Sequence, residues 1–389
     1  MSSLKQILDN ASLGKEITRE EAYALMLNSN IHELCNIANN IRRLKKGNVV
    51  TYSRKVFIPL TNLCRDSCSY CTYKREPNSN GAVMMKPEQV LDMAEKGKKA
   101  KCTEALFMTG ERPEQKYGEA RAWLRSMGFS TTTEYIAHMS ELVLKKTGLL
   151  PHTNPGNMTR EEMIELRKTN PSLGMMLENV SERLCSHGMA HEFAPSKHPK
   201  MRLRTIQIAG QLKIPFTTGL LVGIGETPEE LIDSLFVIKQ MHADYGHIQE
   251  VIIQNFSPKP DTPMALTPAP TKSYMLKAVA MTRIILPDMN IQVPPNLNQN
   301  NYSQFLNAGI NDWGGISPIT IDHVNPEFPW PSIDGVKYAS ERNGFRFRAR
   351  LPVYPEYIWK EGFLSDNIRD HVYQLCDETG LIREDYLYG

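Results

Sequence analysis

The sequence has no long hydrophobic run and almost no excess of either charge. It contains no stretch of about 18 uninterrupted apolar residues, which excludes a membrane-spanning helix. Lys and Arg number 45 against 43 Asp and Glu, so the net charge of +2 lacks the basic excess of nucleic-acid binders. The first residues lack a secretory pattern, and Asp9, Glu16, Glu20 and Glu21 disfavour a transit peptide. We expect a cytoplasmic protein that binds neither membranes nor nucleic acid.

Cysteine is also scarce, and its distribution is uneven. The seven cysteines are an odd number in a long chain, which argues against a disulfide framework and for a reducing compartment. Four of them are scattered, whereas Cys64, Cys68 and Cys71 lie within eight residues of one another. This crowding makes the triplet the strongest candidate for a functional site.

Short apolar runs alternate with helical patterns from about residue 55 onward. The expected strands are 55–60, 105–108, 149–154, 172–178, 216–222, 249–255, 291–293 and 312–316. Strand–helix alternation predicts parallel strands joined by crossover helices. Eight such units fit a TIM-type (βα)8 barrel, and a doubly wound open sheet is the alternative.

The two ends of the chain differ from this central part. Residues 1–54 are helical in pattern, with a capping box at Thr18 and Glu21. Residues 319–389 hold loop-like sequence rich in proline and aromatics, with a helix expected near 366–379. We therefore divide the chain into a helical lead-in (1–54), a barrel (55–318) and a C-terminal extension (319–389).

The three cysteines follow the first expected strand directly, where barrel active sites are built. Three thiolates can each bind one iron of a cubane cluster, which leaves the fourth iron open to another ligand. A structural zinc site is the alternative, although zinc favours four ligands and no partner CxxC unit is present. Three unrelated buried cysteines are a further alternative.

The Cys-x3-Cys-x-aromatic-Cys pattern, with Tyr70 as the aromatic residue, resembles the signature of the radical S-adenosylmethionine (SAM) superfamily. The resemblance implies a [4Fe–4S] cluster on Cys64, Cys68 and Cys71, with SAM chelating the fourth iron. It also implies reductive cleavage of SAM to methionine and a 5′-deoxyadenosyl radical.

Further elements similar to those of the superfamily occur in the same order along the chain. Thr109-Gly110-Glu111 resembles the element that holds the ammonium of SAM. Glu178, at the end of the fourth expected strand, corresponds to a polar residue that contacts the ribose. Arg202 corresponds to a carboxylate-binding arginine, with a solvated helix charge as the alternative. Gly223 belongs to a glycine motif beside the adenine.

Several longer phrases resemble the deazaflavin-forming CofG branch of the superfamily. They are 61–66 (TNLCRD), 150–156 (LPHTNPG), 214–219 (IPFTTG), 246–256 (GHIQEVIIQNF) and 313–318 (WGGISP). The resemblance implies an ammonia-lyase-type FO synthase of coenzyme F420 biosynthesis. Its substrate would be the adduct that CofH makes from tyrosine and 5-amino-6-(D-ribitylamino)uracil. Hydrogen abstraction from the benzylic carbon, ring closure and loss of ammonia, an electron and a proton would give 7,8-didemethyl-8-hydroxy-5-deazariboflavin (FO).

Polar residues at or near strand ends are candidates for handling this substrate. Asn62, Thr153, Asn154, Gln254 and Asn255 are the expected substrate-binding residues. His152 and Asp312 are the acid–base candidates: imidazole titrates near neutral pH, and a loop-capping role is the alternative for Asp312. For His247, a structural role is favoured. The implied partners are CofH and an electron donor such as ferredoxin or flavodoxin.

Two other interpretations stay open at this point. The first is another radical SAM carbon-skeleton enzyme, such as CofH or a menaquinone-pathway synthase; biotin synthase is disfavoured because no second group of cysteines is present. The second is a zinc-stabilised binding protein without catalysis.

Overall fold

Eight parallel strands close into a barrel in the computed structural model, which describes residues 3–299 and 301–388. The strands are β1 (Val49–Thr61), β2 (Glu104–Thr109), β3 (Leu150–Asn154), β4 (Ser172–Gly174), β5 (Phe216–Val222), β6 (Ile248–Asn255), β7 (Ile291–Gln292) and β8 (Asp312–Ile316). They pair in sequence order, and β1 pairs with both β8 and β2, which closes the ring. The TIM-type fold is therefore confirmed.

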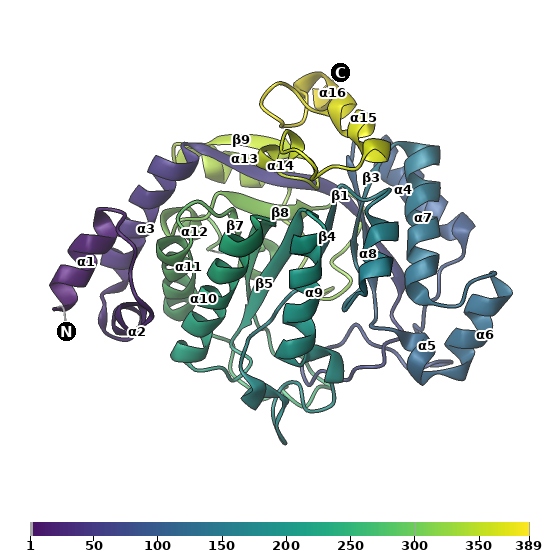
Figure 1. Ribbon diagram of the computed structural model, residues 1–389, viewed down its shortest axis with the longest axis horizontal. Helices are drawn as coiled ribbons and strands as arrows, with labels where there is room; N and C mark the ends of the chain where they lie inside the picture. Colours follow the sequence, from purple (N-terminus) through teal and green to yellow (C-terminus); the bar gives the residue numbers. More distant parts are fainter. Residues whose placement is uncertain (1–2, 300, 389) are drawn as a thin grey trace.

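Helices surround this barrel and cover its outer face (Figure 1). Those between the strands are α4 (Pro87–Lys99), α5 (Pro113–Lys116), α6 (Gly118–Ser126), α7 (Thr132–Thr147), α8 (Arg160–Leu166), α9 (Pro199–Gln211), α10 (Pro228–Tyr245), α11 (Lys272–Ile285) and α12 (Gln304–Asn307). Two capping boxes seen in the sequence are confirmed here, at Thr159 before α8 and at Thr227 before α10. In each, the threonine hydroxyl accepts from the third helical N–H.

Three helices precede the barrel: α1 (Leu4–Ser12), α2 (Arg19–Asn28) and α3 (Ile31–Lys46). The capping box at Thr18 begins α2 as the sequence predicts. Helix α3 packs on α11 and α2 packs on α10. The lead-in thus covers one side of the barrel, and its buried Leu34, Ile37 and Ile41 belong to the main hydrophobic core.

Strand β1 begins at Val49, earlier than the expected residue 55, because its first half has a partner that the sequence did not suggest. That partner is β9 (Arg346–Arg350), which runs parallel to β1 from Val49 opposite Arg346 to Ser53 opposite Arg350. Strand β4 is shorter than expected and ends at Gly174. The extension therefore adds a ninth strand to the sheet rather than packing on it as a separate layer.

The remainder of the extension contains α13 (Ile333–Arg342), α14 (Pro355–Ile358), α15 (Asp366–Leu375) and α16 (Glu384–Tyr388). In Figure 1 the yellow C-terminal segment lies over the end of the barrel where the strands begin. The buried Leu351, Val353 and Tyr354 pack against this end. The cysteine loop, which follows the end of β1, therefore lies at the opposite end of the barrel.

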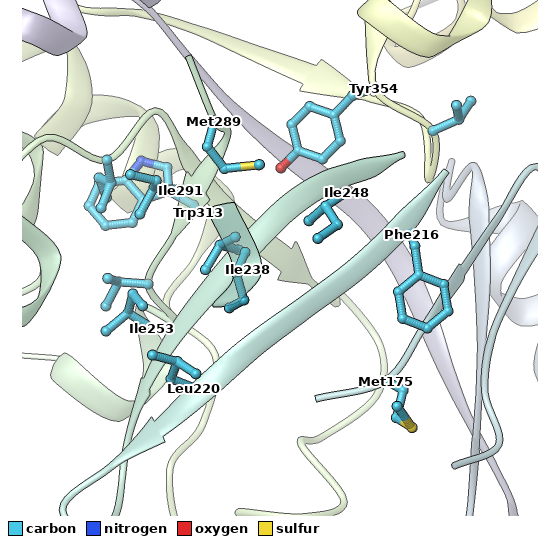
Figure 2. Close-up of a cluster of buried hydrophobic side chains, with 14 of the residues drawn as sticks. Met175, Phe216, Leu220, Ile238, Ile248, Ile253, Met289, Ile291, Trp313 and Tyr354 are labelled. Carbon is cyan, nitrogen blue, oxygen red and sulfur yellow. The ribbon is translucent and has the colours of Figure 1, made fainter. Parts of the chain in front are cut away.

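The main core fills the layer between the barrel and its helices. Figure 2 shows part of this core, in which Leu220, Ile253 and Trp313 of the strands and Ile238 of α10 are labelled. The indole N–H of Trp313 donates to the Ser340 hydroxyl at 3.0 Å, which satisfies the one polar group of a fully buried ring. Within the described ranges, no helix is long and apolar enough to cross a membrane.

Candidate active site

A cavity of about 400 Å³ occupies the interior of the barrel. It extends from the three cysteines at the mouth to Arg350 and Pro352 of the C-terminal segment. Its size suits a small-molecule site. Three levels of different chemistry line it: a mouth rich in sulfur and charge, an apolar middle, and a charged floor.

The cysteine loop lies at the mouth, held in place by segments that are distant in sequence. The backbone N–H of Ser67 donates to Phe193 O at 2.8 Å, and that of Ser69 donates to Ala190 O at 2.9 Å. On the other side, Arg65 N–H donates to Glu111 O at 2.9 Å. These contacts clamp the loop from both sides, so its conformation is set before any ligand binds.

All three cysteine side chains line the cavity. Burial raises the pKa of the Cys64 thiol to about 11 and that of Cys68 to about 12; nearby Asp66 contributes at Cys64, while Lys197 opposes the shift at Cys68. The Cys64 sulfur accepts a hydrogen bond from Glu111 N–H at 3.2 Å. Three thiols on one wall are a donor set that fits a [4Fe–4S] cluster.

In the part of the chain that the structure describes, no three His, Cys, Asp or Glu side chains converge on a single metal ion. A cubane cluster does not require such convergence, because each thiolate binds a different iron.

The Gly110–Glu111 element follows β2 and packs directly against this loop. A Cβ on Gly110 would lie 2.0 Å from Leu63 O and 2.7 Å from Cys64 Cβ, so only glycine fits there. The buried Glu111 carboxylate accepts from Asn157 N–H at 3.2 Å. Burial raises its pKa, while the Arg202 guanidinium opposes that rise. Glu111 is thus a carboxyl group held in a fixed position at the mouth.

A second group of charges lies across the mouth, after β4. Glu178 has a left-handed φ of 67° and forms an ion pair with Lys197. Arg202 is buried, and its guanidinium donates to Ser196 O at 2.9 Å and to Met176 O at 3.1 Å. All three side chains line the cavity. A buried residue held at positive φ is strained, which is typical of ligand sites.

Tyr70, which is partly buried, and the buried His191 form an aromatic pair beside the cysteines. The Tyr70 hydroxyl lies 3.1 Å from His191 Nε2, with the rings edge to face. Burial lowers the pKa of His191 to about 3, so its imidazole is neutral at physiological pH and suited to accept the phenol proton. The pair fixes the aromatic residue of the cysteine motif.

The middle level of the cavity is apolar. Phe57 stacks on Trp330, with ring centroids 5.2 Å apart and planes 12° apart. Leu106 of β2, Ile252 of β6 and Met176, which follows β4, complete this level. It separates the charges at the mouth from those at the floor.

Buried charged side chains form the floor, and the C-terminal segment supplies Arg350 at its centre. Arg350 of β9 donates to Asp312 at 2.7 and 3.0 Å and to Glu250 at 3.0 Å. Tyr354 also donates to Glu250, at 2.8 Å. Burial and nearby Asp312 raise the pKa of Glu250, although Arg350 opposes them. A second ion pair joins Lys55 to Glu104 at 2.7 Å.

His152 lies above this floor, level by strand register with Leu106 and Phe57 of the middle level, and both of its ring nitrogens are engaged. Nδ1 lies 2.7 Å from Ser172 Oγ, which itself donates to Pro352 O. The surrounding acceptors assign the Asn154 amide nitrogen to the position 3.1 Å from Nε2, so that it donates there and to Gly174 O. Burial lowers the pKa of His152 to about 4. The imidazole is neutral, with its proton on Nδ1.

Comparison with known proteins identifies the family to which this chain belongs. The family model of the radical SAM superfamily matches residues 58–238. The 7,8-didemethyl-8-hydroxy-5-deazariboflavin synthase of Methanopyrus kandleri is 50% identical over 335 residues, which cover 86% of this chain and 100% of that protein. This chain belongs to the deazariboflavin synthase family of radical SAM enzymes. The family relative from Methanocaldococcus jannaschii is 45% identical over 95% of this chain and 100% of its own.

Longer relatives of the deazariboflavin synthase family also match. The FO synthase of Streptomyces coelicolor is 44% identical over 99% of this chain but only 46% of its own length, so this chain spans about half of that protein. Solved structures show the same fold at low identity. The maturase HydG from Carboxydothermus hydrogenoformans has a TM-score of 0.74 at 17% identity, covering 99% of this chain and 88% of its own. Methylornithine synthase (PylB) has a TM-score of 0.70 at 19% identity, covering 87% and 96%.

Most of the residues that the sequence singled out for this family share the one cavity. Its lining includes Cys64, Cys68, Tyr70, Cys71, Thr109, Gly110, Glu111, His152, Asn154, Glu178, Arg202 and Gln254. They come from six segments of the chain, most of them at or near strand ends, as expected for a barrel site. Their chemical roles remain predictions.

Five other candidates lie off the cavity lining. Asn62 binds the loop that follows it, accepting from Val83 N–H and donating to Gly81 O, each at 2.8 Å. Asn255 accepts from the Asn298 amide at 2.9 Å. Asp312 is fully buried in the ion network of the floor, and Thr153 is fully buried within β3.

Gly223 is the fifth of these. It has a φ of 97°, and a Cβ there would lie 2.6 Å from Pro270. His247, for which a structural role was favoured, is fully buried away from the lining.

Several residues of the cavity were missed by sequence reasoning. Lys197 of the lining lies in an irregular segment that carries no periodic signal, as does His191, which contacts Tyr70 but is off the lining. Lys55, Glu250 and Arg350 lie within strands, where a charged residue is ordinarily assigned to solvent. The signal that would have found them is a charge at an inward position of a strand otherwise buried on both sides.

Proposed function

We propose that this chain forms FO from the adduct of tyrosine and 5-amino-6-(D-ribitylamino)uracil, by ring closure with loss of ammonia. The match to deazariboflavin synthase over that protein's full length carries the proposal. The site supports it, because one cavity joins the cysteine triplet to a polar floor. A radical site at the mouth and a polar substrate below it need such an arrangement.

The cysteine loop is the proposed [4Fe–4S] site, with Cys64, Cys68 and Cys71 as ligands. The proposed SAM site consists of Tyr70, Thr109, Gly110, Glu111, Glu178, Arg202 and Gly223. When bound together, the cluster and SAM supply a 5′-deoxyadenosyl radical that takes hydrogen from the substrate.

Glu111 is well placed to bind the ammonium of SAM. Its carboxylate is held by Asn157 N–H and by a close approach of Gly156, whose added Cβ would lie 1.8 Å from Glu111 Oε2. A fixed buried carboxylate binds a cation without reorganising. The neighbouring Gly110 brings the Glu111 backbone against Cys64, so SAM bound to this carboxylate would lie near the proposed cluster site.

The apolar middle level gives the substrate radical protection. Phe57, Trp330 and Ile252 carry no readily abstracted hydroxyl or thiol hydrogen, and their bulk excludes water from the space below the cysteines. His152, neutral because of its lowered pKa, is the proposed acid–base residue for ring closure. Asp312 would assist through the ion network rather than by contact. Asn154 and Gln254 are the proposed substrate-binding amides on the lining.

The proposed partners follow from the same assignment. CofH would supply the adduct, and the Streptomyces coelicolor relative, of which this chain spans about half, supports a second activity acting next to this one. A low-potential donor such as ferredoxin or flavodoxin would supply the electron. A cytoplasmic location is proposed on the same basis.

An anaerobic assay tests the function. Reconstituted protein is incubated with SAM, dithionite and the adduct, and deoxyadenosine and FO fluorescence are measured. Deuterium placed on the benzylic carbon of the adduct should appear in deoxyadenosine. Transfer of deuterium from free tyrosine instead would assign the chain to the CofH reaction, and the absence of FO with an intact cluster would refute the proposal.

A further inference from the structure

Two glycines of β8 create an open space on the inner wall of the barrel. A Cβ added to Gly315 would lie 2.2 Å from Cε of Lys55, and one added to Gly314 would lie 2.2 Å from Nε2 of Gln292. Lys55 and Gln292, on the strands to either side, therefore lie across the glycine pair. No other residue type at these two positions would let both side chains extend in this way.

Both of these side chains have hydrogen-bonding groups that no described residue occupies. The Lys55 ammonium has three N–H donors, and its one polar contact among the described residues is with Glu104 Oε1 at 2.7 Å. Gln292 is only 6% exposed, and its side-chain amide makes no hydrogen bond to any residue in 3–299 or 301–388. Both side chains line the cavity. The Gln292 amide opens onto the cavity and is not sealed from it, so water or a ligand bound there must satisfy its hydrogen bonds.

The charges around this position determine what kind of ligand it takes. The floor holds two cations, Lys55 and Arg350, and three carboxylates, Glu104, Glu250 and Asp312. Even with a proton on Glu250, no positive charge is left over for an anionic ligand. A neutral hydroxyl suits the position, because it both donates and accepts, and the Lys55–Glu104 pair presents a donor beside an acceptor.

The depth of this site in the barrel identifies which part of the substrate binds there. Lys55 lies six residues before Thr61, about 20 Å along the strand from the end that carries the cysteine loop. The reacting carbon must lie near the mouth, so the floor meets the part of the substrate farthest from that carbon. In the adduct, that part is the end of the ribityl chain.

We propose that Lys55 and Gln292, which lie across Gly314 and Gly315, bind the hydroxyl groups of the substrate's ribityl chain and exclude a phosphorylated chain. This inference rests on the proposed function. It places the specificity for a free polyol at the floor of the barrel. It further requires that any phosphate on the chain be removed by hydrolysis before this enzyme acts.

The test combines a change in the protein with a change in the substrate. Wild-type protein and Gln292→Leu are assayed with the ribityl adduct and with an adduct that carries a methyl group in place of the chain. Gln292→Leu should lower kcat/KM for the ribityl adduct by about ten-fold. It should leave kcat/KM for the methyl adduct unchanged, because that adduct lacks the hydroxyl groups that Gln292 would bind. The exposed Gln240→Leu on α10 is the matched control and should change neither value.

An equal loss with both adducts would overturn the proposal, because it would show a structural role for Gln292. Lys55→Gln provides a second, independent variant, and iron content and SAM binding verify that each variant is folded. Wild-type protein should also turn over the 5′-phosphorylated adduct at least about ten-fold more slowly, and equal rates would refute exclusion of phosphate. Absence of FO from the wild type with the ribityl adduct would instead refute the proposed function itself.

Discussion

Replacing Arg350 with methionine should strongly destabilise the barrel. Arg350 is 3% exposed and is the cation that neutralises both Glu250 and Asp312. Methionine preserves much of the volume but leaves two buried carboxylates without their shared partner. Breaking a buried ion pair from one side costs about 3–5 kcal/mol, against a total stability of about 5–15 kcal/mol for a typical domain. The free energy of unfolding should therefore fall by at least about a fifth.

The loss should depend on pH in a defined direction. Burial already raises the folded-state pKa of Glu250 above its unfolded value, and removing Arg350 removes the main influence that lowers it. A carboxyl group with a raised folded pKa favours its protonated form in the fold, so stability decreases as pH rises through that window. Lowering the pH from neutral toward the ordinary carboxyl pKa should therefore restore part of the stability of Arg350→Met.

Urea denaturation of the anaerobic protein, followed by tryptophan fluorescence, measures both effects. Arg348→Met is the matched control, because it lies on the same strand but pairs near the surface with Asp377 and Glu384. It should cost about 1 kcal/mol or less. Adding Asp312→Asn to Arg350→Met should recover part of the loss. An Arg350→Met protein no less stable than Arg348→Met, or one that weakens on acidification, would refute the assignment of this network.

Three further predictions concern the mouth of the cavity. Cys68→Ala should abolish both the reconstituted cluster absorbance near 400 nm and SAM cleavage, whereas Cys376→Ala should preserve both. Glu111→Gln should weaken SAM binding by about ten-fold in calorimetry with iron content unchanged, and an unchanged affinity would remove this residue from the SAM site. Gly110→Ala should displace the cysteine loop, because its Cβ would meet the rigid Leu63 carbonyl at 2.0 Å; normal iron content would contradict this.

Local signals in the sequence were sufficient for much of the barrel. The bounds of β5 and β8 agree with those expected, and the capping boxes at Thr159 and Thr227 begin helices as predicted. Each of these elements is specified by residues within its own segment. The first half of β1 was missed because it pairs with β9, whose residues lie far along the chain and carry three arginines.

The residues of the candidate site were likewise predicted where they form local motifs and missed where distant segments bring them together. The cysteine loop and Gly110–Glu111 were predicted because each is a compact motif at the end of a strand. Lys197 was missed because it reaches the site only through the contact between the cysteine loop and residues 190–193, which no local pattern encodes. Asn62 shows the opposite case: a polar residue at a strand end whose amide is fully used by its own loop.

The closed floor has a consequence for kinetics. Arg350, Pro352 and Tyr354 are buried at the base of the barrel, while the proposed SAM site lies at the mouth above the substrate. A molecule bound at the floor must therefore pass the SAM site when it enters and again when it leaves. We expect compulsory-order kinetics, with the adduct binding before SAM, and with methionine and deoxyadenosine released before FO. Preloading with SAM should then slow the first turnover, because bound SAM would block the path of the adduct to the floor.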